Sequence, residues 1–156
     1  MNNKGFTVVE LIAAFSITMV ISAFLFELLI EVKNIFVETA IKTNIQEKTA
    51  IVSKNINNLF KETGNVVSCS SPEACTINGK NITVNHNYST SVPDKINVNN
   101  QEFSMPKDGD EYVKITDIEL TPGGQGTEGY LKVKFDITSG NLSKPYKYNV
   151  VYYYTK

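Results

Sequence analysis

The chain contains no arginine, only one histidine and only two cysteines among its 156 residues. All 15 cations are lysines, so it lacks the side chain that best grips a phosphate through two parallel hydrogen bonds. His86 alone cannot complete a histidine-based metal site or a serine–histidine triad. The net charge of −1 gives no overall attraction to nucleic acid or anionic lipid. We therefore expect no enzymatic activity, catalytic residue, metal site or cofactor.

Residues that break helices are missing from the N-terminal part, because residues 6–63 contain neither proline nor glycine. Residues 6–30 carry only two charges, Glu10 and Glu27, and 16 uncharged residues separate them. A membrane-spanning helix needs about 20 mostly apolar residues. We therefore expect residues 6–30 to span a membrane, with one carboxylate near each surface.

The orientation and processing of this run follow from its flanks. Lys4 precedes it and places the N-terminus in the cytoplasm by the positive-inside rule. An ordinary secretory signal is the alternative, and it would need a small-x-small cleavage site after the apolar block. The nearest candidate is residues 21–24, but bulky apolar residues continue to Ile30. We therefore favour an anchor over an ordinary signal peptide.

Residues 31–62 continue the helical pattern, with apolar side chains on one face only. The apolar positions recur in three- and four-residue steps, which indicates an amphipathic helix. They are Val37, Ile41, Ile45, Val52, Ile56 and Leu59, flanked by Ile35, Phe36, Ile51 and Phe60. Lys61 and Gly64 suit a last helical turn and its cap. We expect one helix over residues 6–62, whose second half packs against a globular domain.

Two hairpins are predicted after the helix. Asn78-Gly79 separates two β-type runs, and this dipeptide supplies the positive φ angles of a tight type I′ turn. Asn99-Asn100 gives a weaker signal of the same kind. The flanking strands are expected at Cys75–Ile77 with Asn81–Val84, and at Lys95–Val98 with Glu102–Met105.

Three longer strands are expected at Tyr112–Leu120, Tyr130–Thr138 and Tyr146–Tyr154. They are rich in β-branched and aromatic residues, which suit a half-buried pleated surface. The predicted fold class is α+β, with a long N-terminal helix packed on an antiparallel sheet formed by residues 63–156.

The two cysteines, Cys69 and Cys75, are separated by five residues. In a chain with an export-like N-terminus, such a close pair indicates a small disulfide loop outside the cytoplasm. Two free thiols are the alternative.

The N-terminal motif Gly5-Phe6-Thr7-Val8-Val9-Glu10, after a short lysine-bearing leader, resembles the class III signal of type IV pilins and pseudopilins. The long helix, small β domain and short cysteine loop extend the resemblance along the chain. It implies that residues 1–5 are a leader, removed by prepilin peptidase between Gly5 and Phe6 on the cytoplasmic face. It also implies N-methylation of Phe6 and pairing of Glu10 with the terminal amine of an adjacent subunit, because an unpaired buried charge is costly.

The resemblance also implies partners and a location. The partners are other pilin subunits, contacted through the N-terminal helix, and a cytoplasmic-membrane platform with its assembly ATPase. Before assembly the chain would be a single-pass membrane protein with a cytoplasmic N-terminus. Afterwards its β domain would be extracytoplasmic, in a cell-surface filament.

The subclass and role are less defined. Many major pilins carry proline where this chain has Glu27, so we favour a minor pilin or pseudopilin. Adhesion, twitching motility, type II protein secretion and DNA uptake in competence all stay open. A different class of protein, a single-pass anchored extracellular binding module that never polymerises, is the alternative.

Three weaker signals have simple structural interpretations. Asp108, Asp110 and Glu111 could contribute to a calcium site, but calcium takes six to eight oxygens, so we favour a solvated turn. Gly123–Gly129 lacks the Gly-Lys-Ser/Thr end of a phosphate loop, and we expect a hairpin loop. Glu27 is expected to reach water at the membrane surface, and Lys33 of a neighbour is the alternative partner.

Lysines alternate with aromatic residues near the C-terminus. Such interleaving can bind single-stranded nucleic acid, but a sheet with one buried face produces the same alternation, and we favour the sheet. The residues are Lys132, Lys134, Lys144, Lys147, Phe135, Tyr146, Tyr148, Tyr152, Tyr153 and Tyr154.

Overall fold

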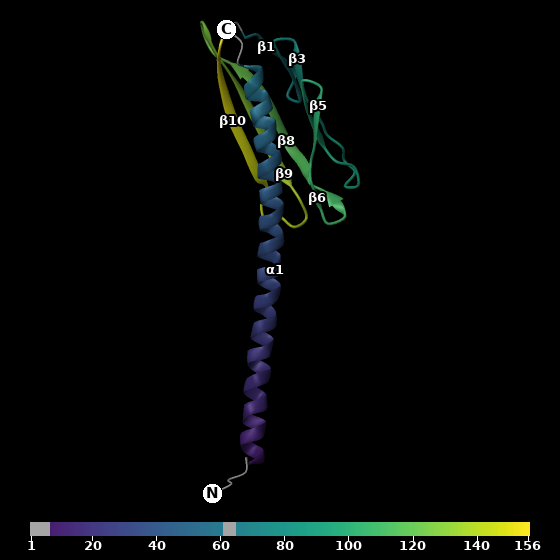
Figure 1. Cartoon of the computed structure of the whole chain (residues 1–156), viewed down its shortest axis with the longest axis vertical. Coiled ribbons are helices and arrows are strands. Elements are labelled where there is room, and N and C mark those ends of the chain that lie inside the picture. Colours follow the sequence, from purple (N-terminus) through teal and green to yellow (C-terminus); the bar gives the residue numbers. More distant parts are fainter. Residues whose placement is uncertain (1–6, 61–64) are drawn as a thin grey trace. The chain divides into compact units, whose positions relative to one another are not determined.

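The computed structural model describes residues 7–60 and 65–156. Its described part contains one helix, α1 (Val8–Leu59), followed by ten strands (Figure 1), which confirms the α+β class. The chain divides into two compact units, Met1–Val37 and Glu38–Lys156. We call residues 8–37 the apolar segment and residues 65–156 the head.

Helix α1 has 52 residues and agrees with the predicted helix. The predicted ends at Phe6, Lys61 and Gly64 lie outside the described residues. The buried side chains of α1 follow the expected stripe, and they are Ile41, Ile45, Thr49, Val52, Ile56 and Leu59. Thr49 is the unexpected member of this list. Its hydroxyl donates to the Ile45 carbonyl at 2.9 Å, so no polar group is buried without a partner there.

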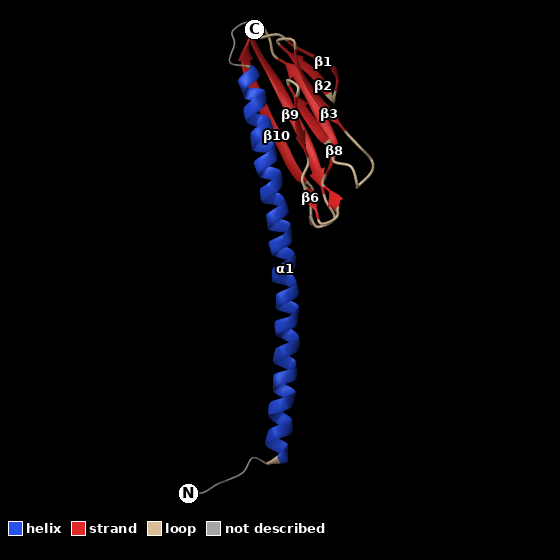
Figure 2. Ribbon diagram, turned by 45° about the vertical axis from the view of Figure 1, so that its right-hand side comes forward, coloured by secondary structure: helices blue, strands red, loops and turns tan. Residues whose placement is uncertain are grey.

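Three strands form the sheet that packs on this stripe, in the order β10-β9-β8. Their bounds are β8 (Lys114–Gly123), β9 (Glu128–Thr138) and β10 (Tyr146–Thr155), close to the predicted ones. The Phe60 ring stacks on the ring of Tyr154, with centroids 5.0 Å apart. The Tyr152 hydroxyl donates to the Ser53 hydroxyl at 2.7 Å. Figure 2 shows the second part of α1 beside β9 and β10.

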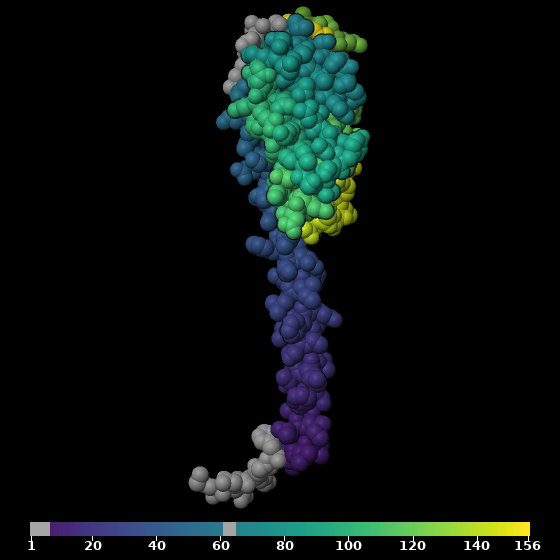
Figure 3. Space-filling view, turned by 90° about the vertical axis from the view of Figure 1, so that its right-hand side faces the viewer, coloured from purple at the N-terminus to yellow at the C-terminus, as the bar shows by residue number. Residues whose placement is uncertain are grey.

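A second, five-stranded sheet has the order β1-β2-β3-β4-β5. Its strands are β1 (Val67–Ser71), β2 (Ala74–Ile77), β3 (Lys80–Asn85), β4 (Lys95–Val98) and β5 (Gln101–Ser104). The expected turns are confirmed, because Asn78, Gly79, Asn99 and Asn100 all have positive φ angles. In Figure 3 the residues coloured teal to green, which include this sheet, form one continuous face of the head.

The antiparallel strands of the head are divided among three sheets, a division that the sequence did not indicate. The third sheet is the small pair β6 (Lys107–Asp108) and β7 (Glu111–Tyr112). Neither this pair nor strand β1 of the five-stranded sheet was expected from the sequence. The turn between β6 and β7 confirms the expected turn at the acidic cluster. The two larger sheets approach one another where the Leu120 amide donates to the Pro72 carbonyl at 3.0 Å, but no β ladder joins β1 to β8 among the described residues.

Asn78 connects the first hairpin to the end of the helix. Its side-chain amide donates to the Leu59 carbonyl at 3.2 Å and to Asn65 Oδ1 at 2.8 Å. Its side-chain oxygen accepts from the Val66 amide at 2.9 Å. A residue expected only to make a turn therefore also satisfies an orphan carbonyl in the last turn of α1.

Candidate functional site

Thr7 and Glu10 cap the N-terminus of α1. Glu10 Oε2 accepts from the Thr7 amide at 2.9 Å and from the Thr7 hydroxyl at 3.0 Å. The Glu10 amide donates back to Thr7 Oγ1 at 3.3 Å. This reciprocal pattern is a capping box, in which a threonine and a glutamate three residues later satisfy the free amides at a helix start. Glu10 therefore has a structural role within its own chain.

The capping box leaves half of the carboxylate available. Only Oε2 of Glu10 is engaged, and Oε1 has no hydrogen-bond partner among residues 7–60 and 65–156. The predicted processing residues Gly5 and Phe6 lie outside the described residues. The Glu10 carboxylate can accordingly hold the first turn and still accept a second donor.

The apolar segment exposes its side chains over its whole surface. From Val8 to Phe36 its large apolar residues range from 40% exposed at Leu28 to 76% at Val9, and Val37 is half-buried. Helix α1 is long and apolar enough to cross a membrane, with a mean hydropathy of 2.3 in its most apolar 18-residue window, none of which is buried. Such exposure is far beyond the scattered apolar residues of an ordinary protein surface. The apolar segment is compatible with a membrane anchor.

Three charged residues of the apolar segment lack partners within the described part of the chain. They are Glu27, Glu31 and Lys33. All three lie in α1, and their side chains form no hydrogen bond or ion pair with one another. Lys33 lies six residues after Glu27 and two after Glu31. Neither spacing brings side chains together on a helix, where neighbours are three or four residues apart.

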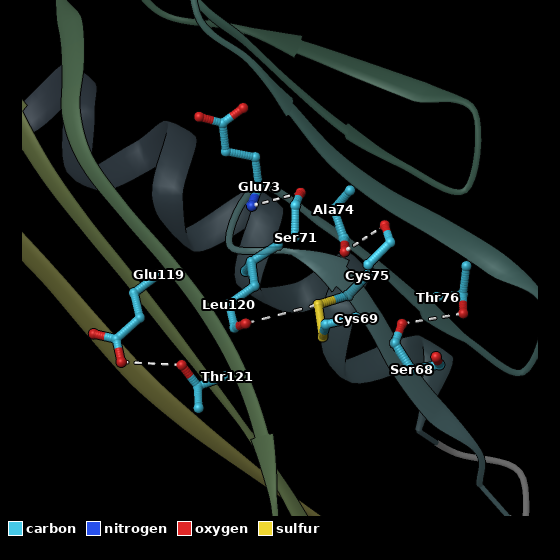
Figure 4. The surroundings of a disulfide bond; sticks show 11 residues. Ser68, Cys69, Ser71, Glu73, Ala74, Cys75, Thr76, Glu119, Leu120 and Thr121 are labelled. Atoms are coloured by element: carbon cyan, nitrogen blue, oxygen red, sulfur yellow. Dashed lines mark hydrogen bonds between the residues drawn. A yellow bond between two sulfur atoms is a disulfide. The ribbon is translucent and has the colours of Figure 1, made fainter.

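In the head, Cys69 and Cys75 form a disulfide (Figure 4), as predicted. The two cysteines face one another directly across β1 and β2. Cys75 is buried, and its Sγ lies 4.0 Å from the Leu120 main-chain oxygen. The bond joins β1 to β2 on either side of their short turn, and Cys75 contacts β8 through Leu120.

A fully buried carboxylate, Asp94, organises the loop between β3 and β4. Its Oδ1 accepts from the Asn87 amide at 2.9 Å and the Lys114 ammonium at 3.2 Å. Its Oδ2 accepts from the Ile115 amide at 2.8 Å and lies 3.1 Å from His86 Nδ1. Lys114 is satisfied further by the carbonyls of Asn87 and Val92. Four donors around one buried acid make a structural junction. The single histidine, His86, is therefore part of this junction.

The acidic turn is tied into the head through one of its members. Asp108 accepts from the Ser139 hydroxyl, from the Asn141 amide at 3.2 Å and from Asn141 Nδ2 at 2.6 Å. No group of three or more metal-ligating side chains occurs among the described residues. Asp110 and Glu111 are exposed and do not join Asp108 in a common site.

In β9 and β10 the lysines lie on the outer face of the sheet, and most of the aromatic rings lie on the buried face. The rings of Phe135, Tyr148, Tyr152 and Tyr154 are buried, and burial raises the pKa of the Tyr152 hydroxyl above its ordinary value. On the outer face, Lys134 contacts Asp117 at 2.5 Å, and this hydrogen bond lowers the pKa of the Asp117 carboxyl. Most of the rings are therefore packed in the core, which is the arrangement expected of a half-buried sheet.

Comparison of the chain with protein-family models, with curated proteins and with solved structures found no match.

Proposed function

We propose that this chain is a structural subunit of a type IV pilus or related filament, a minor pilin or pseudopilin assembled through its N-terminal helix. The observation that carries the proposal is an apolar segment, exposed on all sides, with one carboxylate in its first turn directly behind the motif Gly5-Phe6. Cleavage by prepilin peptidase between these two residues would create an amine four residues before Glu10. Oε1 of Glu10 has no hydrogen-bond partner among the described residues, and it can accept a hydrogen bond from that amine in a neighbouring copy.

The physical role of the carboxylate follows from its surroundings. A charge among apolar helices is costly unless it is paired, whereas a pair with good geometry is tolerated. Copies inserted at the right height would satisfy Glu10, and copies at other heights would leave it unpaired. Apolar packing would thus provide cohesion and Glu10 would select the register.

An anchored binding module that never polymerises is the second candidate, and the capping box favours it. The bonds to Thr7 account for a glutamate at this position without any neighbour. This candidate predicts an unprocessed N-terminus and no filament.

Two variants separate the two roles of Glu10. Glu10→Gln removes the charge and keeps a side chain that serves equally in a capping box. Thr7→Ala removes the cap, which costs about 1 kcal/mol, and keeps the carboxylate. In a host with a prepilin peptidase, we expect Glu10→Gln to lower the yield of sheared filaments at least about tenfold, the effect of some 1.4 kcal/mol per contact. We expect Thr7→Ala to lower it less.

Cleavage and methylation of the N-terminus can be measured in the same filament preparations. Mass spectrometry of the wild-type chain should find an N-terminus at Phe6 carrying one added methyl group. A chain that starts at Met1 and gives no filament would favour the anchored module. Normal filament yield from Glu10→Gln would contradict the proposed pairing.

A further inference from the structure

Glu27 is the second carboxylate of the apolar segment. It is surrounded along the helix by Leu25, Phe26 and residues 28–30, all apolar and exposed. The helix is regular through this region, so no local break brings a backbone donor to the Glu27 side chain. Lys33 is the only cation in residues 8–37, and it has no partner in the described chain either.

The uncharged stretch between Glu10 and Glu27 is shorter than the hydrocarbon core of a bilayer is thick. The 16 residues between Glu10 and Glu27 span about 24 Å at 1.5 Å per residue. The hydrocarbon core of a bilayer is about 30 Å thick. With Glu10 at one surface, Glu27 therefore lies inside the opposite edge of the hydrocarbon. An ionisable residue in that position normally faces an oppositely charged partner.

We propose that Glu27 of one copy forms an ion pair with Lys33 of a second, parallel copy. This inference rests on the proposed assembly through the N-terminal helix. Six residues separate the two positions, so the second copy must be displaced by about 9 Å along the helix axis. The displacement has a fixed sense, because the copy that supplies Lys33 lies lower, on the N-terminal side, relative to the copy that supplies Glu27.

Glu31 is the competing partner for Lys33 and requires a displacement of only about 3 Å. Two features favour Glu27. Glu31 lies farther from the centre of the apolar run and reaches water more easily. Helical side chains also lean toward the N-terminus, and the longer lysine leans farther, so its ammonium approaches the level of Glu27.

The angular positions of the two groups indicate an open assembly. At 100° per residue, Lys33 and Glu27 of one copy lie about 120° apart around the helix. A copy that uses Glu27 toward one neighbour therefore directs Lys33 toward another. Contacts between different faces repeat in one direction and extend into filaments, whereas a closed dimer needs the same face on both copies.

Cysteine cross-linking of the full chain in its host membrane tests this geometry. A chain that carries both Glu27→Cys and Lys33→Cys should give a ladder of covalent oligomers on mild oxidation. Co-expression of the two single variants should give dimers only. The native disulfide is already closed within the head, so it does not supply reactive thiols. The matched control carries Glu31→Cys with Lys33→Cys. We expect it to cross-link at least about fivefold less, because Glu31 lies about 6 Å farther along the helix axis than Glu27.

A charge swap tests the energetic role. Glu27→Lys places two cations together and should reduce filament yield at least about tenfold, whereas Glu27→Lys combined with Lys33→Glu should restore most of it. Cross-linking of the Glu31→Cys control that equals or exceeds that of the Glu27→Cys chain would overturn the Glu27–Lys33 pair but not the proposed function. The same holds if wild-type filaments form and the charge swap gives no rescue. Absence of wild-type filaments together with absence of every cross-link would overturn the proposed function as well.

Discussion

The apolar segment and the head treat their charged side chains in opposite ways. In the head, Asp94 is fully buried and accepts from four donors of its own unit. In the apolar segment, Glu27 and Lys33 are exposed and have no partner within the described chain. Asp94 therefore finds all of its partners within its own unit, whereas Glu27 and Lys33 find none among the described residues.

The same contrast holds for apolar surface. In the head, the side chains of Ile77, Ile115 and Leu131 are fully buried, whereas the large apolar side chains from Val8 to Phe36 are at least 40% exposed. Burial of apolar area drives folding in proportion to the area removed from water. Folding of the single chain cannot gain this contribution from the apolar segment. The exposed apolar surface is compatible with a membrane anchor, in which a lipid bilayer would provide this contribution.

The strongest test of the self-sufficient head is Asp94→Ala. The change leaves the Lys114 ammonium, whose side chain is 14% exposed, without its counter-ion and removes an acceptor from two backbone amides. Breaking a buried ion pair on one side costs roughly 3–5 kcal/mol. We expect the free energy of unfolding to fall by this amount in urea titrations of the full chain in detergent, followed by near-ultraviolet circular dichroism. Asp110→Ala, in an exposed turn, is the control and should leave the curve unchanged.

Loss of the disulfide should have the next largest effect. Replacing Cys69 and Cys75 together by serine opens a loop of about seven residues, and loop-closure entropy assigns roughly 2 kcal/mol to such a closure. The measurement is the unfolding midpoint of the double variant beside that of the wild-type chain with and without reductant. A midpoint that reductant does not move in the wild-type chain would show that the bond adds nothing to the head.

Much of this fold could be predicted because its signals are local. Three- and four-residue spacing marked the buried stripe of α1, and Asn-Gly marked the first hairpin with its positive φ angles. The capping box was also spelled out as Thr-x-x-Glu ahead of an apolar run, and reading it would have given Glu10 a second role. That motif was missed because the pilin-like signal explained the same glutamate.

The junction around Asp94 could not be predicted, because its partners are not local. Lys114 and Ile115 follow it by about 20 residues, and only the packing of the β3–β4 loop on β8 brings them together. In sequence Asp94 follows a proline in a polar loop and looks like an ordinary turn residue. The division into three sheets was missed for a similar reason, since turn chemistry predicts which strands pair but not where a ladder stops.

A smaller effect is expected from the contact between α1 and β10. Tyr152→Phe removes the hydroxyl that donates to Ser53 at 2.7 Å and lies 3.1 Å from the Tyr148 hydroxyl. Loss of one such hydrogen bond costs about 1 kcal/mol at neutral pH. Tyr153→Phe is the matched control, because Tyr153 is 79% exposed and makes no side-chain hydrogen bond in the part of the head that the structure describes.

The pH dependence sharpens this last comparison. Burial raises the pKa of Tyr152 above its ordinary value of 10.0, so the folded state keeps a proton that the unfolded state releases above that pH. The stabilising contribution is fully present below pH 10.0 and is lost as the pH rises beyond it. Urea titrations at neutral pH and just above pH 10.0 should therefore show a smaller loss of stability in Tyr152→Phe than in the wild-type chain. A residual loss should persist in the variant, because burial raises the pKa of Tyr154 too. Identical pH dependence in Tyr152→Phe and wild type would mean that the α1–β10 contact admits water, and that the head is less tightly closed than Asp94 suggests.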